Sequence, residues 1–204
     1  MNAPTATNSP AIGQPFEGGF YAGSFQLAGI LYAIVVAPKA EGEHEDAPWI
    51  RNYAAVPGAR SYDDGLANTD AMVAASSLLA KWARDLRIND RDDWYLPSQD
   101  ELEILYRNLK PGTEQNTCYA RSGINLSVIP PTRPYIPEFP LQTSALAFQA
   151  GGEQAFGTRW YWSSTQHAAL SDYAWCQNFY AGSQYGGSTN SKFRARAVRR
   201  IPIE

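Results

Sequence analysis

Cysteine and histidine are scarce in this chain of 204 residues, which has two of each. Cys118 and Cys176 lie far apart in the sequence and form neither a disulfide framework nor a pair with metal-ligand spacing. The fold could still bring them together, but we expect the reduced, half-buried thiols of a cytosolic product. The sequence therefore predicts no metal ion and no other cofactor.

An excess of positive charge and long apolar runs are also missing. The formal net charge is −3 and the pI is about 5.4, which argues against a broad electrostatic footprint for nucleic acid. No run of about eighteen apolar residues is present, so we expect no membrane span. The segment from Met1 to Pro10 has neither the basic start nor the apolar core of a secretory signal. We expect synthesis in a cytoplasm.

Apolar and aromatic residues are plentiful enough for a folded domain. Hydrophobic residues make up 44% of the chain and charged residues 18%, so general disorder is not expected. The first fifteen residues are rich in Pro, Thr, Asn and Ala, which predicts a flexible arm. Residues 16–204 then form one domain.

The N-terminal part of that domain predicts a β-hairpin and a loop. Aromatic and β-branched runs flank Ala28-Gly29 between Phe16 and Pro38, a pattern typical of two strands around a tight turn. The acidic segment from Glu41 to Asp46 lacks a convincing metal-ligand pattern and predicts a solvated surface loop.

Two helices are indicated by apolar periodicity. The first is capped by Asn68 or Thr69, ends near Arg87, and buries Met72, Ala75, Leu79, Trp82 and Leu86. The second begins at Ser98 with Glu101 completing a capping box, stops before Pro111, and buries Leu102, Leu105, Tyr106 and Leu109. Prolines then rule out central strands over residues 110–140, which predicts a long insertion that is either functional or an interaction surface.

The C-terminal part has the composition of a binding surface. No charged residue occurs from Ala174 through Ser191, and the stretch from Tyr180 to Ser191 combines Tyr with Ser, Gly, Asn and Gln. Tyrosine offers a large contact at low entropic cost, while the small polar residues supply adaptable hydrogen bonds. The alternative is a solvated loop between two strands.

Several motifs resemble those of one family. Trp94 to Leu102 matches the pattern W-x-L-P-[ST]-x-x-E-L, and Tyr161 to Thr165 matches Y-W-S-S-T, as in the DUF1566 (Lcl C-terminal-like) domains. Further matches follow in the same order at Ala174-Trp175, Phe179, Gly182, Lys192 and Arg196 to Arg199. The resemblance spans roughly Gly19 to Ile201. It implies an α+β, C-type lectin-like fold with two helices packed on antiparallel strands, here with an N-terminal β-hairpin.

The resemblance implies a display scaffold. Similar domains occur in phage tails and prophage regions, and some resemble variable proteins of diversity-generating retroelements, whose C-terminal surface varies on a constant frame. Frame positions would be Trp162, Trp175, Phe179, Gly182 and Arg196. Ligand-facing positions would be Tyr173, Asn178, Tyr180, Ser183, Gln184, Tyr185, Ser188, Thr189, Asn190 and Phe193.

Strand alternation refines this assignment. With Trp175 and Phe179 pointing inward, Asn178 and Tyr180 point outward. Gln177 then falls on the buried face, where it needs a hydrogen-bond partner.

The expected function is a non-enzymatic recognition module, a tail-tip adhesin of a phage or prophage that binds a bacterial surface receptor, protein or glycan. Other tail proteins would contact its N-terminal region, and a homo-oligomer is compatible with this role. The expected location is the virion tail, or the bacterial cytoplasm for a prophage product. The Glu-Pro-Asn and Trp-Asn-Asp triplets of calcium-dependent sugar-binding lectins are missing, so the fold alone implies neither calcium nor sugar.

The alternative is a lectin-fold enzyme or modifying factor, either a hydrolase or a relative of the formylglycine-generating enzymes. Ser163 or Ser164, His167 and Asp172 supply the side chains of a hydrolytic set, but no Gly-x-Ser-x-Gly elbow surrounds either serine. Cys118 and Cys176 do not reproduce the cysteine motif of the formylglycine-generating enzymes.

The basic C-terminus requires its own explanation. Lys192, Arg194, Arg196, Arg199 and Arg200 could indicate nucleic acid, but alternation along a strand divides them between two faces. We expect them to pair with Asp and Glu of the same domain or of a partner chain.

Overall fold

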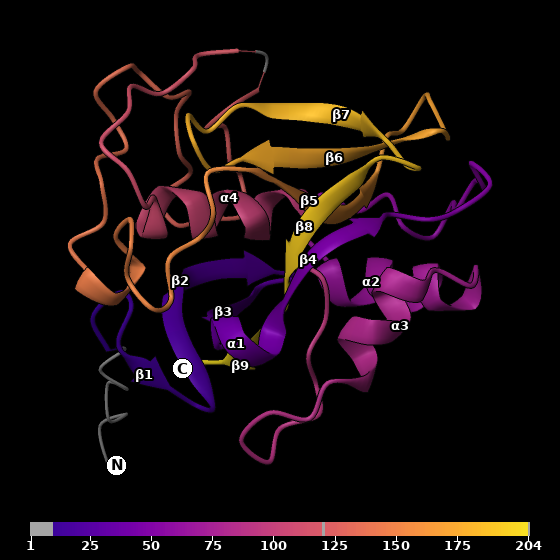
Figure 1. Ribbon diagram of the computed structural model, residues 1–204, viewed down its shortest axis with the longest axis horizontal. Helices are drawn as coiled ribbons and strands as arrows, with labels where there is room; N and C mark the ends of the chain where they lie inside the picture. The colour runs from indigo at the N-terminus through magenta and orange to yellow at the C-terminus, as the bar shows by residue number, and fades with distance from the viewer. Residues whose placement is uncertain (1–9, 120, 204) are drawn as a thin grey trace.

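The chain forms two β-sheets joined by helices in an α+β arrangement, as a computed structural model that describes residues 10–119 and 121–203 shows (Figure 1). The first sheet has the strand order β1 (Pro15–Phe16), β2 (Gly19–Leu27), β3 (Ile30–Val36), β9 (Val198–Pro202). The second has the order β4 (Glu43–Pro48), β8 (Lys192–Arg196), β5 (Trp160–Gln166), β6 (Tyr173–Asn178), β7 (Gln184–Ser188). The helices are α1 (Lys39–Gly42), α2 (Gly65–Ala74), α3 (Leu78–Asp85), α4 (Gln99–Leu109) and a 3-10 turn at Leu146–Phe148.

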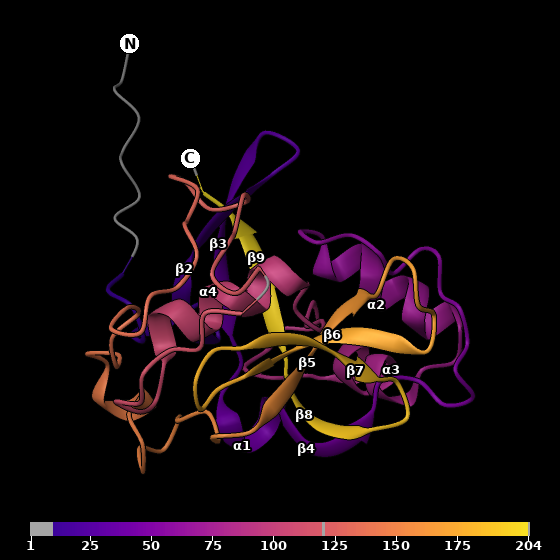
Figure 2. The ribbon, with the colours of Figure 1, turned by 90° about the horizontal axis from the view of Figure 1, so that it is seen from above.

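The N-terminal hairpin is confirmed. β2 and β3 pair antiparallel with Leu27 opposite Ile30, and the two turn residues Ala28 and Gly29 have φ of 50° and 83°. Two left-handed residues give the turn that suits the twist of a two-residue hairpin. β9 pairs with β3 on the other side, so the last strand of the chain closes this sheet beside the hairpin (Figure 2).

Helix α4 matches its prediction. The Ser98 side chain accepts a hydrogen bond from the Glu101 N–H, and the Glu101 carboxylate accepts one from the Ser98 N–H. All four apolar positions predicted to be buried are buried. The helix contacts β2 of the first sheet and β5 and β6 of the second, so it ties the two sheets to one core.

The first predicted helix is wrong in its start and its continuity. α2 begins at Gly65 with Asp64 as the N-cap, and Ser76, with a φ of 67°, separates it from α3. Ser77 caps α3 and donates a hydrogen bond to the Trp49 carbonyl. The apolar spacing runs on across the break because both helices pack on the same core cluster.

The acidic segment is not only a surface loop. Glu43–Pro48 is strand β4, paired with β8 so that Glu43 lies opposite Arg196. The Glu43 carboxylate accepts hydrogen bonds from Arg194 (2.8 Å) and Arg196 (3.1 Å), and both pairs are largely buried. These contacts stabilise an acidic strand that its own composition does not favour.

The C-terminal arginines pair within the domain, as expected. Besides the two Glu43 pairs, Arg199 contacts Asp93 at 2.6 Å and Arg200 contacts Asp64 at 2.8 Å.

The predicted arm is only partly described. Residues 1–9 lie outside the described residues, but residues 10–15 pack on the first sheet. The Gly13 N–H donates to the Tyr21 carbonyl, the Tyr21 N–H donates to the Gln14 carbonyl, and Ile12 contacts the core.

The proline-rich insertion has no regular strand among its described residues, only an isolated bridge between Ile136 and Phe139. Asn116 holds it together, because its amide donates to the carbonyls of Pro137 and Pro140 at 3.1 and 3.0 Å. Buried Tyr135 anchors the insertion on α4 by donating to Glu103.

The interior contains two large apolar clusters, and β5 and β6 lie between them. Tyr161 and Phe179 belong to the cluster around α4, whereas Trp162 and Cys176 belong to the cluster under α2 and α3. Both cysteines are free thiols, with Cys118 exposed and Cys176 buried. No helix in the described part of the chain has the length and apolar character that crossing a membrane requires.

The two predicted frame tryptophans differ. Trp162 is fully buried, donates to the Ala47 carbonyl at 2.9 Å and packs against Phe193. Trp175 is only half-buried, so its assignment to the core is wrong. Alternation failed here because β6 is covered on both faces, and Trp175 lies where the cover on one face ends.

We expect Trp162→Ala to lower the free energy of unfolding by about 3–5 kcal/mol, the range for removing a core aromatic side chain. Trp175→Ala should cost about 1–2 kcal/mol, because less of its surface is buried. Urea unfolding of both variants beside the wild type measures the difference. Equal losses would contradict the distinct environments of the two side chains.

Candidate recognition surface

The predicted ligand-facing residues lie on β6, β7, β8 and the turns between them. β7 is an edge strand, paired only with β6 within its sheet. The register places Trp175 opposite Gly186 and Cys176 opposite Tyr185. Directly paired residues share a face, so one face carries Trp175 with Gly186 and the other carries Tyr185.

Exposure divides the ten predicted residues. Tyr180 and Tyr185 are 49% and 52% exposed, and Asn190 is exposed as well. The half-buried members are Tyr173, Asn178, Ser183, Ser188 and Phe193.

Gln184 and Thr189 are buried, which corrects the expectation that the whole stretch is exposed. The Gln184 N–H donates to the Ser122 hydroxyl at 3.0 Å, so the proline-rich insertion covers this end of β7. The Thr189 N–H donates to the Asp172 carbonyl at 2.9 Å, which fixes the turn after β7.

One face of this edge carries a row of aromatic rings. The Trp160 ring lies 6.4 Å from that of Tyr185 and 6.2 Å from that of Phe193, centroid to centroid. A shallow hollow of about 350 Å³ is lined by Tyr119, Trp160 and Tyr185 with two smaller residues, Thr117 and Ser183. Sequence reasoning missed Trp160 and Tyr119, although alternation with buried Trp162 could have placed Trp160 on this face.

The other face carries a second hollow of about 360 Å³. Its lining residues are Tyr119, His167, Leu170, Tyr173, Trp175, Gln184, Tyr185 and Gly186. None of these side chains carries a formal charge when His167 is neutral. The His167 and Trp175 rings stack with centroids 5.5 Å apart.

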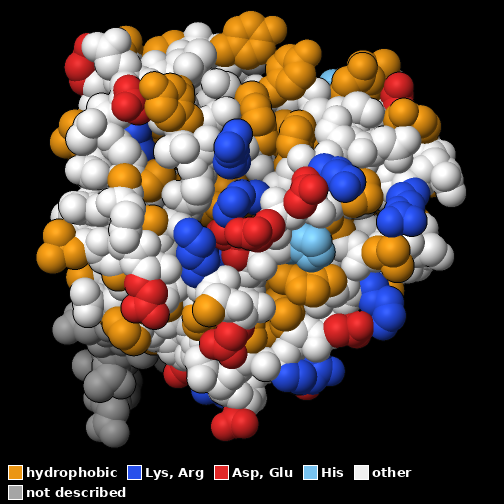
Figure 3. All heavy atoms as spheres, in the orientation of Figure 1, with side chains coloured by type: hydrophobic (Ala, Val, Ile, Leu, Met, Phe, Trp, Pro, Cys, Tyr) orange, Lys and Arg blue, Asp and Glu red, His pale blue; other side chains and the backbone are white. Residues whose placement is uncertain are grey.

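Charged residues lie beside this region. Figure 3 shows basic and acidic side chains interspersed across the middle of one face, over β4 and β8. Lys192 pairs with Asp46 at 3.6 Å, and Arg194 pairs with Glu43 and Glu45. The positive charges of β8 are therefore matched by the negative charges of β4.

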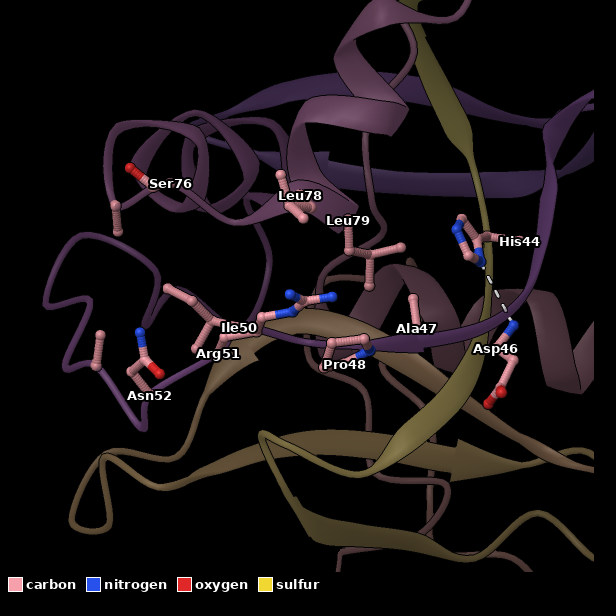
Figure 4. Close-up of a pocket in the computed structure, with 12 residues that line it drawn as sticks. His44, Asp46, Ala47, Pro48, Ile50, Arg51, Asn52, Ser76, Leu78 and Leu79 are labelled. Carbon is pink, nitrogen blue, oxygen red and sulfur yellow. Dashed lines mark hydrogen bonds between the residues drawn. The ribbon is translucent and has the colours of Figure 1, made fainter.

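A larger hollow of about 510 Å³ lies between β4 and the α2–α3 junction (Figure 4). Arg51, Ile50 and Leu79 are among its lining residues, and His44 accepts a hydrogen bond from the Asp46 N–H at 3.4 Å. None of the ten predicted ligand-facing residues lines it.

The hydroxyl groups proposed for a hydrolytic set serve the fold. Ser163 donates to the Trp175 carbonyl at 2.8 Å, and Ser164 donates to the Pro97 carbonyl at 3.1 Å. His167 Nδ1 accepts hydrogen bonds from the Ala169 and Leu170 N–H groups, which closes a turn. Within the described residues neither serine hydroxyl hydrogen bonds to His167.

The motifs fall within a region that one family model matches. A family model described as the Lcl C-terminal domain matches residues 48–199. The chain belongs to the Lcl C-terminal domain family. The match covers the elements from the end of β4 into β9 and leaves out the N-terminal hairpin, a narrower span than the resemblance from Gly19 to Ile201. No match was found among curated proteins.

In this Lcl C-terminal domain the motifs Trp94–Leu102 and Tyr161–Thr165 lie in the interior. Trp94, Leu96 and Glu101 are buried, as are the hydroxyl residues from Ser163 to Thr165. The exposed tyrosines of the C-terminal sheet lie outside these motifs. The motifs therefore account for the frame rather than for the exposed surface.

Buried carboxyl groups at the start of α4 hold the frame. Glu101 accepts hydrogen bonds from the Tyr95 hydroxyl (2.6 Å) and the Ser98 N–H (2.7 Å), and Asp100 accepts one from Ser127. Burial raises the pKa of Glu101 to about 7 and that of Asp100 to about 6. The folded domain therefore holds these protons at a pH where the unfolded chain releases them.

This difference predicts pH-dependent stability. Because the folded pKa of Glu101 lies above the ordinary 4.5, the stabilisation is fully present below pH 4.5 and is lost as the pH rises through about 7. In wild type, the free energy of unfolding should therefore fall between pH 5 and 8, and Glu101→Gln should reduce this fall by on the order of 2 kcal/mol. A glutamine can still accept from Ser98 and donate to Tyr95. Urea titrations across this range test it, with exposed Asp85→Asn as control. Parallel wild-type and Glu101→Gln curves would contradict the assignment.

Proposed function

We propose that this Lcl C-terminal domain is a non-enzymatic recognition module that acts as a receptor-binding adhesin at the tail tip of a phage or prophage particle. Membership of the family indicates a recognition-type domain. The observation that carries the finer proposal is the uncharged aromatic surface at the edge of the second sheet, built on a buried frame.

The exposed tyrosines fit a binding role better than a structural one. Tyr180 and Tyr185 project from the edge of a sheet whose interior is already filled by Tyr161, Trp162 and Phe179. Exposed aromatic groups that gather at one edge are typical of interaction sites. Aromatic residues are also enriched among the few side chains that dominate binding energy.

The hydrogen bonds of the Y-W-S-S-T segment favour binding over catalysis. Its hydroxyl groups donate to backbone carbonyls inside the domain, and His167 closes a turn. A nucleophile needs a free hydroxyl beside a base.

The proposed partners are a bacterial surface receptor, protein or glycan, at the aromatic surface and other tail proteins at the N-terminal region.

The two ends of the domain suit two partners. Figures 1 and 2 both place the β2–β3 hairpin away from β7. Attachment through the first sheet would leave the aromatic edge of the second sheet free for a receptor. This arrangement supports a virion tail location, and a homo-oligomer formed through the first sheet is compatible with it.

We expect Tyr180→Ala and Tyr185→Ala each to weaken binding to a host cell by about 1–2 kcal/mol, because each removes an exposed aromatic contact. The melting temperature should barely change, since exposed positions usually shift stability by less than about 0.5 kcal/mol. The measurement is binding of the labelled full chain to a panel of bacteria, beside a thermal melt.

Tyr53→Ala is the matched control, because Tyr53 is 52% exposed but lies outside the predicted surface. If both test variants bind as well as the wild type, the aromatic surface is not the recognition site. Failure of the wild type to bind any cell in the panel would count against the adhesin itself.

Deletion of residues 1–9 separates attachment from folding. The described fold begins at Pro10 and residues 10–15 contact β2, so deleting residues 1–9 leaves these contacts in place. We expect the truncated chain to melt and bind cells like the wild type but to be lost from purified particles. Unchanged incorporation would show that this segment does not attach the domain.

A further inference from the structure

The hollow beside Trp175 is lined by residues from the second sheet and from the proline-rich insertion. Gly186 forms its floor, because it lies opposite Trp175 in the ladder and leaves the space above it open. The rings of Trp175, His167 and Tyr173 line it from the second sheet and the turn after β5. Tyr119 closes it from the proline-rich insertion.

Two buried polar atoms on the lining residues have no hydrogen-bond partner within the described part of the chain: Trp175 Nε1 and Gln184 Oε1. The Gln184 Nε2 group donates to the Gln99 carbonyl at 3.5 Å, which orients the amide and leaves its oxygen free. A buried polar atom without a partner costs about 1–3 kcal/mol. Such atoms at a pocket indicate a bound water or ligand.

The ladder places both residues on one face of the sheet. Gln184 is two residues from Gly186 on β7, so the Gln184 and Trp175 side chains rise from the same face. Three other atoms share this unpaired state, on Gln99, Gln177 and Thr189, but those residues do not line the hollow. Of the five residues with such an atom, only Trp175 and Gln184 line the hollow.

We infer that this pocket binds an uncharged saccharide unit, whose hydroxyl groups hydrogen bond to Trp175 and Gln184. A hydroxyl group both accepts and donates, so the hydroxyl groups of a sugar can pair with the indole N–H and with the amide oxygen. The apolar C–H face of a sugar ring matches the aromatic lining. Among the described residues no Lys, Arg, Asp or Glu lines the hollow to neutralise a sulfate, carboxylate or ammonium group.

The size of the hollow limits the ligand. About 360 Å³ is near the lower end of small-molecule sites, so it takes one or two rings of a longer glycan rather than a helix. The inference rests on the proposed function and deepens it, because it names a neutral glycan as the receptor class. A peptide side chain with an amide group is the competing ligand.

Gly186 provides a substitution that fills the pocket without strain. A Cβ atom there would lie 3.7 Å from Tyr173 Cβ and 3.9 Å from His167 Cδ2, which are ordinary contacts. Gly186→Ala should therefore fold while it occupies the floor of the site. Gly112→Ala is the matched control, because a Cβ at Gly112 meets nothing within 4 Å.

The experiment is a screen of the purified full chain on an array of neutral, sulfated and sialylated glycans and of unrelated peptides, followed by calorimetry with the strongest neutral ligand. Trp175→Phe keeps an aromatic ring but removes the N–H, and it should weaken binding about tenfold, the value of one hydrogen bond. Gly186→Ala should weaken it at least as much. Gly112→Ala should not change it, and a chelator should have no effect.

Several results would overturn the inference: binding only to charged glycans, only to peptides or to nothing, or neutral-glycan binding that survives both pocket substitutions. Its failure is separable from that of the adhesin proposal. If Gly186→Ala leaves cell binding unchanged, the adhesin proposal stands and the saccharide site is contradicted. Neutral-glycan binding without attachment to any cell would support the saccharide site and contradict the adhesin proposal.

Discussion

The buried guanidinium of Arg196 is the contact on which the arrangement of the two sheets depends. It lies at the end of β8, two residues before the chain enters β9 of the other sheet. Arg196 Nε donates to the Ala37 carbonyl at 2.8 Å, and Nη1 and Nη2 contact Glu43 and Gln154. A buried charge without partners is strongly destabilising. Arg196 therefore requires the end of β3, the start of β4 and the segment before β5 to meet at one point.

Fixing β8 in this way determines where recognition can occur. β5, β6 and β7 extend from β8 in order, so β7 becomes the free edge. The frame restricts some positions of that edge: a Cβ at Gly187 would lie 2.6 Å from Phe193, and Gly182 has a φ of 79°. Tyr180, Tyr185 and Asn190 face solvent instead. A surface that varies on a constant frame would change at these exposed positions and not at the two glycines.

Local signals predicted their elements, and distant contacts determined the rest. The capping box at Ser98 lies within one turn, so helix α4 could be placed from sequence. The acidic strand β4 could not, because its partner Arg196 is about 150 residues away. Composition marked the stretch that carries the exposed Tyr180 and Tyr185, but the position of Tyr119 beside Tyr185 depends on how the insertion folds back. The break at Ser76 had no glycine to mark it.

The two hollows share a boundary that relates the two proposals. Tyr119 and Tyr185 line both, so they form a ridge between the Trp160 face and the Trp175 pocket. A glycan end held beside Trp175 would leave the remaining rings to cross this ridge toward Trp160. No Lys, Arg, Asp or Glu of the described residues lines either hollow, so contact area and hydrogen bonds would supply the affinity. Binding of this kind is little screened by salt, which suits a domain whose net charge is only −3.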